Sequence, residues 1–237
     1  MAHNIKALLF DVFGTVVDWR TGIAREGEEF GRATGLAGID WTAFADEWRA
    51  LYQPTLEKVR SGEMPWQPLD DLHRIELNKL LADRGLTNLP EQATDHFNRG
   101  WHRLPPWPDA VPGLMRMKEK YILGTCSNGN VAQMVNLAKH SGLPWDMVLG
   151  AEMARQYKPR PEVYQISVAL LRLHPAECVL VAAHNYDLRA AAGCGLKTAF
   201  VVRPKEYGPA GKPDFVPSQK WDFVAEDFNR LAEQLGC

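Results

Sequence analysis

Four short runs of apolar residues stand out along this chain, and each is too short to form a core helix. They lie at Ile5 to Asp11, Tyr121 to Cys126, Cys178 to Ala183 and Thr198 to Val202. Continuous apolar runs of this length are typical of strands that are buried on both faces. Helix-like stretches such as Val131 to His140 and Glu162 to Leu173 separate them. The alternation predicts an α/β fold built on a parallel sheet.

The segment 18–104 has a different pattern, with no convincing strand and with apolar residues at helical spacing. The spaced positions include Phe44, Trp48 and Leu51, and then Leu72, Ile75 and Leu80. The run from Leu104 to Pro108 cannot be helical, because its prolines remove backbone donors and restrict the residues before them. We therefore expect a Rossmann-like core domain of residues 1–17 and 105–237, with a helical cap domain inserted at 18–104.

Polar residues follow several of the predicted strands or lie in strand-to-helix loops. They are Asp11, Ser127, Lys158 and Asp187. In parallel α/β sheets the working residues gather outside the carboxyl ends of the strands. The sequence therefore predicts one site at which these four side chains meet.

Composition and charge exclude several classes of partner. The 27 Lys and Arg against 29 Asp and Glu give a net charge of −2, which offers no excess of basic residues to hold a nucleic acid backbone. No stretch approaches the roughly 20 apolar residues of a membrane helix, and Met1 to Lys6 lacks the long apolar run of a secretory signal. We expect a cytosolic protein that binds neither nucleic acid nor membrane.

The four cysteines are widely spaced and form no C-x-x-C pair, which argues against a zinc knuckle and a disulfide framework. They are Cys126, Cys178, Cys194 and Cys237. We expect reduced thiols, mostly buried.

Four motifs in chain order resemble the haloacid dehalogenase superfamily. They are the segment Asp11 to Thr15, the segment Ser127 to Gly129, the pair Lys158-Pro159, and Asp187. The resemblance spans nearly the whole chain and implies a Rossmann-like core, a nucleophilic aspartate at Asp11 and a cap inserted soon after it.

Most members of that superfamily resemble phosphohydrolases, and two of their features are absent from this chain. The second aspartate that would protonate a leaving group is replaced by Phe13, and the first carboxylate of the late magnesium-binding pair is replaced by Ala183. Without a hard dication, a phosphate and Asp11 would repel each other at bonding distance. We therefore expect no metal ion, no cofactor and a leaving group, such as a halide, that departs as a stable anion.

The remaining details are similar to the L-2-haloacid dehalogenases, which convert short 2-haloacids to 2-hydroxy acids. The resemblance implies Asp11 as nucleophile, Lys158 as the cation that keeps it ionised, and Asp187 in ester hydrolysis, with Ser127 and Thr15 also in the catalytic set. It further implies a substrate or halide site made by Arg49, Asn128, Phe13, Trp66, Tyr164, His184 and Tyr186.

The chain departs from that family at residues 182–187, which read Ala-Ala-His-Asn-Tyr-Asp where Ser-Ser-Asn-x-Trp-Asp is usual. A serine that supports the site is lost, and His184 stands in place of an asparagine. A histidine can donate to a small anion or act as a base near neutral pH. The change predicts a retuned leaving-group preference that can extend to fluoride.

Two other functions stay open on the sequence. A small phosphatase or phosphonatase would depend on magnesium, and a non-catalytic protein that kept the fold would release no halide, with Ala182 as its best support. Each site residue also has a structural interpretation: Asp11 as a helix cap, Arg49 as a surface residue of the cap, and His184 as a satisfied core histidine. Family resemblance favours a homodimer.

Overall fold

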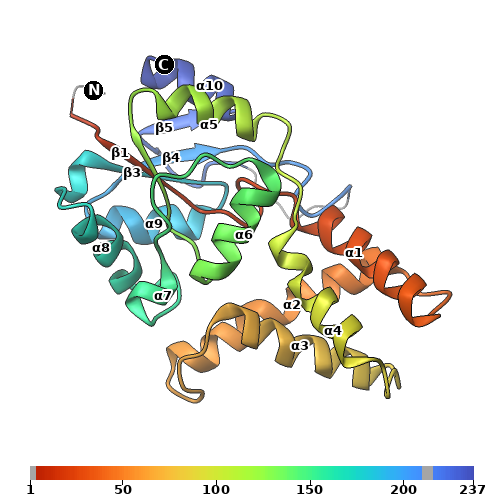
Figure 1. Cartoon of the computed structure of the whole chain (residues 1–237). Coiled ribbons are helices and arrows are strands. Elements are labelled where there is room, and N and C mark those ends of the chain that lie inside the picture. The colour runs from red at the N-terminus through yellow and green to blue at the C-terminus, as the bar shows by residue number, and fades with distance from the viewer. Residues whose placement is uncertain (1–3, 210–215) are drawn as a thin grey trace.

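The computed structural model describes residues 4–209 and 216–237, and its centre is a parallel sheet in the strand order β2-β1-β3-β4-β5 (Figure 1). The strands are β1 (Ala7–Phe10), β2 (Ile122–Thr125), β3 (Cys178–Ala182), β4 (Lys197–Val201) and β5 (Phe223–Ala225). Leu9 of β1 lies opposite Gly124 on one side and Leu180 on the other. The predicted α/β fold is confirmed, whereas β5 was missed because three residues are too few to show a pattern.

Helices cover both faces of the sheet. Leu8 and Phe10 belong to one apolar cluster, while Ala7 and Leu9 belong to a second, because successive residues of a strand point to opposite faces. The helices that add apolar residues to the first cluster include α5 (Ala110–Lys118), α6 (Val131–Ser141) and α10 (Phe228–Leu235). Those adding to the second include α8 (Pro161–Leu170) and α9 (Asn185–Gly193). Two short elements, α7 (Ala151–Ala154) and η2 (Pro175–Glu177), complete this part.

The helical insertion lies between β1 and β2 and forms a separate layer beside the sheet domain (Figure 1). It comprises α1 (Trp19–Thr34), α2 (Trp41–Arg60), α3 (Leu69–Asp83), α4 (Glu91–Asn98) and η1 (Arg99–His102). Asp18 and Asp40 accept hydrogen bonds from the first backbone N–H groups of α1 and α2, which explains where these helices begin. The predicted cap is therefore present as a helical insert.

One part of the predicted helical pattern in the cap is wrong. Ile75 is 43% exposed, and the buried face of α3 runs instead through Leu72, His73, Glu76 and Leu77. The prediction used only apolar residues, so it left out the polar residues at positions 73 and 76. It therefore assigned Ile75 to the buried face in place of Glu76. The cap interior thus holds a buried histidine and a buried glutamate.

The chain enters and leaves the cap through two segments that lie side by side. The Asp18 amide donates to the Pro105 carbonyl at 2.9 Å, and the Trp107 amide donates to the Val16 carbonyl at 3.0 Å. The prolines after Leu104 keep the returning segment extended, as their restricted backbone requires. The domain boundaries that we propose, at 17/18 and 104/105, fall within this paired segment.

One expectation drawn from composition, on the cysteines, is met only in part. Cys126 and Cys178 are buried free thiols, but Cys194 and Cys237 are half-buried, so the cysteines are not mostly buried. Within the described ranges, no helix combines the length and apolar character that a membrane span requires.

Candidate active site

The site forms at the carboxyl ends of the strands, where the sequence predicted it. Asp11 directly follows β1, and Ser127 lies two residues beyond β2. Asp187 lies within the first turn of α9 rather than in the loop before it, and Lys158 comes from the segment between α7 and α8 rather than from a strand end. The two carboxylates and the lysine nevertheless meet, because β1 and β3 are neighbours in the sheet.

Lys158 joins the two carboxylates. Its Nζ atom lies 2.8 Å from Asp11 Oδ1 and 2.5 Å from Asp187 Oδ2. The other carboxylate oxygen of Asp187 accepts from the Tyr164 hydroxyl. All four side chains are buried, so each ionised group is paired rather than hydrated. Buried charges of this kind are held in fixed positions, which suits a reacting group.

Asp11 is ionised at neutral pH. Burial alone would raise the pKa of this carboxyl, but the charge of Lys158 and the hydrogen bond from His184 outweigh it and hold the pKa well below its usual range. The same carboxylates keep the pKa of buried Lys158 well above its usual value. For Asp187 the balance differs, since burial together with the charge of Asp11 raises its pKa. The two aspartates are thus unequal, and Asp11 is the one whose ionised form the site favours.

The second carboxylate oxygen of Asp11 has two further donors. Thr15 donates from Oγ1 to Asp11 Oδ2 at 2.6 Å and accepts from the Ala183 amide at 2.9 Å, so it is fixed to the end of β3. His184 Nδ1 lies 3.0 Å from the same oxygen. Three side chains, Lys158, Thr15 and His184, therefore hold the Asp11 carboxylate.

His184 is buried between two carboxylates. Besides Asp11 on Nδ1, both carboxylate oxygens of Glu206 lie 3.1 Å from Nε2. Burial alone would lower the pKa of His184, but the charge of Glu206 and the hydrogen bond to Asp11 hold it well above its usual value. Because both ring nitrogens face carboxylates, His184 has no free N–H group to offer a ligand in the cavity.

Sequence reasoning missed Glu206. It lies in the turn after β4, where no periodic element precedes it and where buried and exposed residues alternate irregularly. No local sequence signal pointed to it. The structure shows that Gly14 has a positive φ of 85° and that a Cβ added there would lie 2.2 Å from Glu206 Oε1. Gly14 thus serves both the turn and the space that Glu206 occupies.

A cavity of about 500 Å³ opens beside His184. Its lining residues are Trp19, Asp46, Arg49, Ala50, Tyr52, Gln53, His184, Tyr186 and Tyr207. Arg49 comes from α2, and its guanidinium carbon lies 4.2 Å from the centre of the Tyr52 ring, which is cation–π distance. Its Nη1 is buried and has no hydrogen-bond partner within the described ranges. The cavity is therefore lined by two cationic side chains, Arg49 and His184, one from each domain, and by one carboxylate, that of Asp46.

Ser127 and Asn128 form the turn after β2. The Ser127 hydroxyl accepts from the Gly129 amide at 3.0 Å, and Asn128 accepts from the Lys158 amide at 2.8 Å. The Asn128 side chain also donates to the hydroxyl of Tyr52 in the cap at 2.8 Å. Tyr52, which the sequence did not single out, therefore ties the cap to the loop that carries Lys158.

Of three further aromatic candidates, Tyr186, Phe13 and Trp66, only Tyr186 lines this cavity. Tyr186 lines the cavity and stacks on His184 with ring centres 5.8 Å apart. Phe13 is buried against Trp101 with ring centres 5.8 Å apart, and Trp66 packs on Tyr157 at 4.8 Å. Tyr186 is therefore placed to touch a ligand, whereas Phe13 and Trp66 pack against other aromatic rings.

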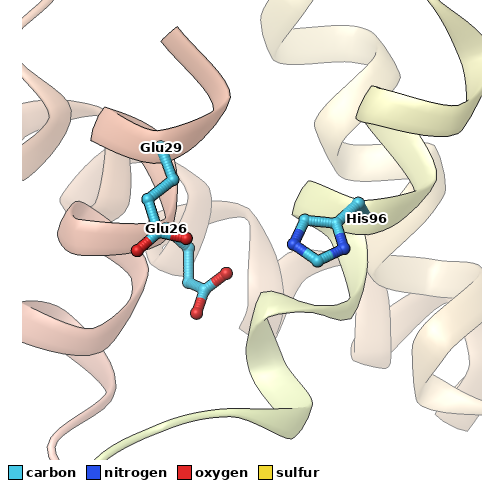
Figure 2. A group of neighbouring side chains, drawn as sticks. All are labelled: Glu26, Glu29 and His96. Atoms are coloured by element: carbon cyan, nitrogen blue, oxygen red, sulfur yellow. The ribbon is translucent and has the colours of Figure 1, made fainter. Parts of the chain in front are cut away.

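A second group of polar side chains lies within the cap. Glu26 and Glu29 of α1 face His96 of α4 closely enough to share a cation (Figure 2). Arg103, however, donates to Glu26 through both Nε and Nη2, and its Nη2 lies 3.2 Å from His96 Nε2. A guanidinium thus already supplies the positive charge that a metal ion would bring.

Comparison with known proteins identifies the family. The model of the haloacid dehalogenase-like hydrolases matches residues 5–195. This chain belongs to that family. A defluorinating L-2-haloacid dehalogenase and a second L-2-haloacid dehalogenase, both of known structure, are each 46% identical over 98% of this chain, covering 96% and 98% of theirs, with TM-scores of 0.96 and 0.93. Among curated relatives, (S)-2-haloacid dehalogenase 4A of Burkholderia cepacia is 26% identical over 98% of this chain and 100% of its own length.

Phosphatases are also among the proteins that resemble this chain. Hexitol phosphatase A of Escherichia coli is 28% identical over 80% of each chain. Family membership alone therefore leaves the choice between carbon–halogen and phosphate-ester chemistry to the residues around Asp11.

Proposed function

We propose that this protein is an L-2-haloacid dehalogenase that hydrolyses short (S)-2-haloacids to 2-hydroxy acids. The observation that carries the proposal is the environment of Asp11, an ionised carboxylate held by Lys158 and His184. Phe13 and Ala183 stand where the phosphatases of the family carry carboxylates. Such a site supplies a nucleophile but neither a leaving-group acid nor a full set of magnesium ligands. The 46% identity to two L-2-haloacid dehalogenases supports the same activity.

In the proposed reaction Asp11 attacks the carbon that bears the halogen from the side opposite the halide. A carbon–oxygen bond forms as the carbon–halogen bond breaks, which gives an ester between substrate and enzyme. Water then attacks the ester carbonyl, the alkoxide leaves with one proton from water, and the second proton is released. Because the stereocentre reacts only once, its configuration is inverted.

The other side chains take supporting parts in this proposal. Lys158 keeps Asp11 ionised and offsets charge that develops on the ester, and Asp187 assists the attack of water. Ser127 and Asn128 bind the carboxylate of the substrate, while Arg49, His184 and Tyr186 surround the departing halide. Thr15 orients Asp11. Fluoride is included among the leaving groups, and a relative with 46% identity is described as defluorinating.

A single turnover in oxygen-18 water tests the covalent route. We expect the product hydroxyl to come from Asp11 and to be unlabelled, with the solvent oxygen left in the Asp11 carboxylate. The Asp11→Asn variant, which is isosteric but not nucleophilic, should release no halide. Labelled product in the first turnover would mean direct attack by water and would overturn the mechanism.

A substrate screen tests the choice of chemistry. Fluoro-, chloro- and bromoacetate are compared with a chromogenic phosphate ester in the presence of magnesium. Halide release without phosphatase activity is expected. Phosphate release alone would favour the phosphatase, and inactivity on every substrate would favour a binding protein that kept the fold.

Assembly and compartment belong to the same proposal. We propose a cytosolic homodimer, supported by family resemblance and by the buried free thiols Cys126 and Cys178, which suit a reducing compartment. Light scattering of the purified protein should give twice the chain mass of 26.6 kDa. A mass equal to that of one chain would refute the dimer.

A further inference from the structure

Glu206 lies behind His184, on the side away from Asp11, and its position is fixed from several directions. Arg203, three residues earlier, donates from Nε to the Thr15 carbonyl at 2.8 Å and pairs with Asp109 through both terminal nitrogens. The Glu206 amide closes the turn onto the Arg203 carbonyl at 3.2 Å. Trp19 Nε1 donates to Glu206 Oε1 at 3.2 Å. The surrounding hydrogen bonds therefore hold the Glu206 carboxylate in a fixed position beside His184.

The hydrogen-bond geometry constrains the protonation state of the His184 ring. A neutral imidazole has one N–H donor, and its other nitrogen carries a lone pair that would face a carboxylate. Here Nδ1 faces Asp11 and Nε2 faces Glu206, both at hydrogen-bond distance. Only the doubly protonated imidazolium can donate to both carboxylates. His184 is thus a buried cation between two buried anions.

The carboxylates of Asp11 and Glu206 change differently during the reaction, if the proposed function holds. Asp11 loses its negative charge when it becomes an ester, so it then no longer favours the protonated ring. Glu206 forms no bond to substrate and keeps its charge. The other charged or titratable groups around the ring are Arg49 from α2, Asp46 of the same cavity, the phenols of Tyr186 and Tyr207, and Lys158 with Asp187 beyond Asp11. The two carboxylates among them are paired with other cations, Asp46 with Arg20 and Asp187 with Lys158.

We propose that Glu206 is a positioning residue that keeps His184 protonated throughout the catalytic cycle. It holds the imidazolium in place after Asp11 has been alkylated. The wall of the cavity beside His184 therefore stays cationic while the released halide diffuses away and water attacks the ester. The charge of His184 likewise holds the pKa of Glu206 below its usual range despite burial, which is the reciprocal effect.

Nuclear magnetic resonance of nitrogen-15 histidine tests the resting enzyme without any substrate. The His184 signals are assigned by their loss in the His184→Asn variant. Both ring nitrogens should stay protonated up to about two pH units above the ordinary histidine pKa of roughly 6.5. In Glu206→Gln, which removes the charge but keeps the shape, the ring should lose a proton at a pH lower by at least about one unit.

Activity provides the second readout. The alkaline limb of the kcat profile for chloroacetate should move to lower pH by at least about one unit in Glu206→Gln and only part of the way in Glu206→Asp, which retains the charge. Glu26→Gln is the matched control, because Glu26 is equally buried, at 4% exposure, and pairs with Arg103 in the cap. It should leave the alkaline limb in place.

The outcomes separate this proposal from the proposed function. If no haloacid releases halide, the dehalogenase assignment fails while the nitrogen-15 titration still decides the role of Glu206. A singly protonated His184 in the parent at neutral pH would overturn the proposal, and so would equal titrations of parent and Glu206→Gln. If Glu206→Gln does not fold, Glu206→Ala decides, because it also removes the charge, and a His184 pKa equal to that of the parent would then refute the proposal.

Discussion

His184 stands where the family resemblance implies an asparagine, and it differs from asparagine chiefly by its charge. A smaller halide concentrates its negative charge, so a nearby cation should favour the departure of fluoride more than that of chloride. We expect His184→Asn to lower kcat/KM for fluoroacetate more than for chloroacetate, by about 1 to 3 kcal/mol of differential barrier. The ratio of the two kcat/KM values is the measurement, because it cancels general damage to the fold. An unchanged ratio would leave His184 a purely structural role.

Lys158 controls a different property, the ionisation of Asp11. Lys158→Met leaves Asp11 and Asp187 buried without their shared cation, and kcat should fall by about 100- to 1,000-fold. Lys158 helps to hold the pKa of Asp11 below its usual range, so its loss should also move the acid limb of the kcat profile to higher pH. The exposed Lys139 of α6 offers a control, since Lys139→Met should change neither quantity. An acid limb that stays in place would show that His184 and Thr15 suffice to keep Asp11 ionised.

At the scale of elements, helix α3 carries a buried histidine that makes the cap sensitive to acid. Both ring nitrogens of His73 lack hydrogen-bond partners within the described ranges, and burial lowers its pKa to about 3. Because the folded pKa lies below the unfolded value, neutral His73 favours folding above about pH 6.5, and this advantage is lost as the pH falls from there towards about 3. The slope approaches about 1.4 kcal/mol per pH unit in this window.

Replacing His73 by phenylalanine should remove that dependence. The His73 ring stacks on Trp101 with centres 4.4 Å apart, which a phenyl ring can reproduce. We expect His73→Phe to make the free energy of unfolding less dependent on pH between about 6.5 and 4, measured by urea unfolding across that range. The parent and the variant share every other titrating group, so equal slopes would contradict a buried neutral His73.

The elements also show why part of this molecule was predictable from its sequence. Asp11 and Ser127 could be placed because apolar strands of fixed direction bring the residues that follow them to one edge of the sheet. Glu206 could not, since the turn that carries it is positioned by Arg203 and its long-range partners rather than by a local pattern. The burial of His73 was missed for a different reason. His73 lies in a regular helix, but as a polar residue it interrupts the apolar pattern from which the helix was predicted.

For the molecule as a whole, positive charge at the site comes from side chains of both domains. Lys158 and His184 belong to the sheet domain and Arg49 to the cap. We therefore expect dialysis against EDTA to leave halide release unchanged, measured with chloroacetate before and after dialysis. Addition of magnesium to the dialysed enzyme is the control. A roughly tenfold loss of activity that magnesium restores would require metal chemistry that the proposed mechanism does not contain.

The contact between Gly14 and Glu206 has an evolutionary consequence. A side chain at position 14 would displace the Glu206 carboxylate, whose oxygen lies 2.2 Å from the place of a Cβ atom. The two positions are therefore epistatic: while Glu206 is present, any replacement of Gly14 also disturbs His184, although residue 14 does not touch the ring through a side chain. Once Glu206 is lost, only the backbone conformation restricts position 14. Lineages that retain the glutamate should consequently retain the glycine, and their order of loss should be glutamate first.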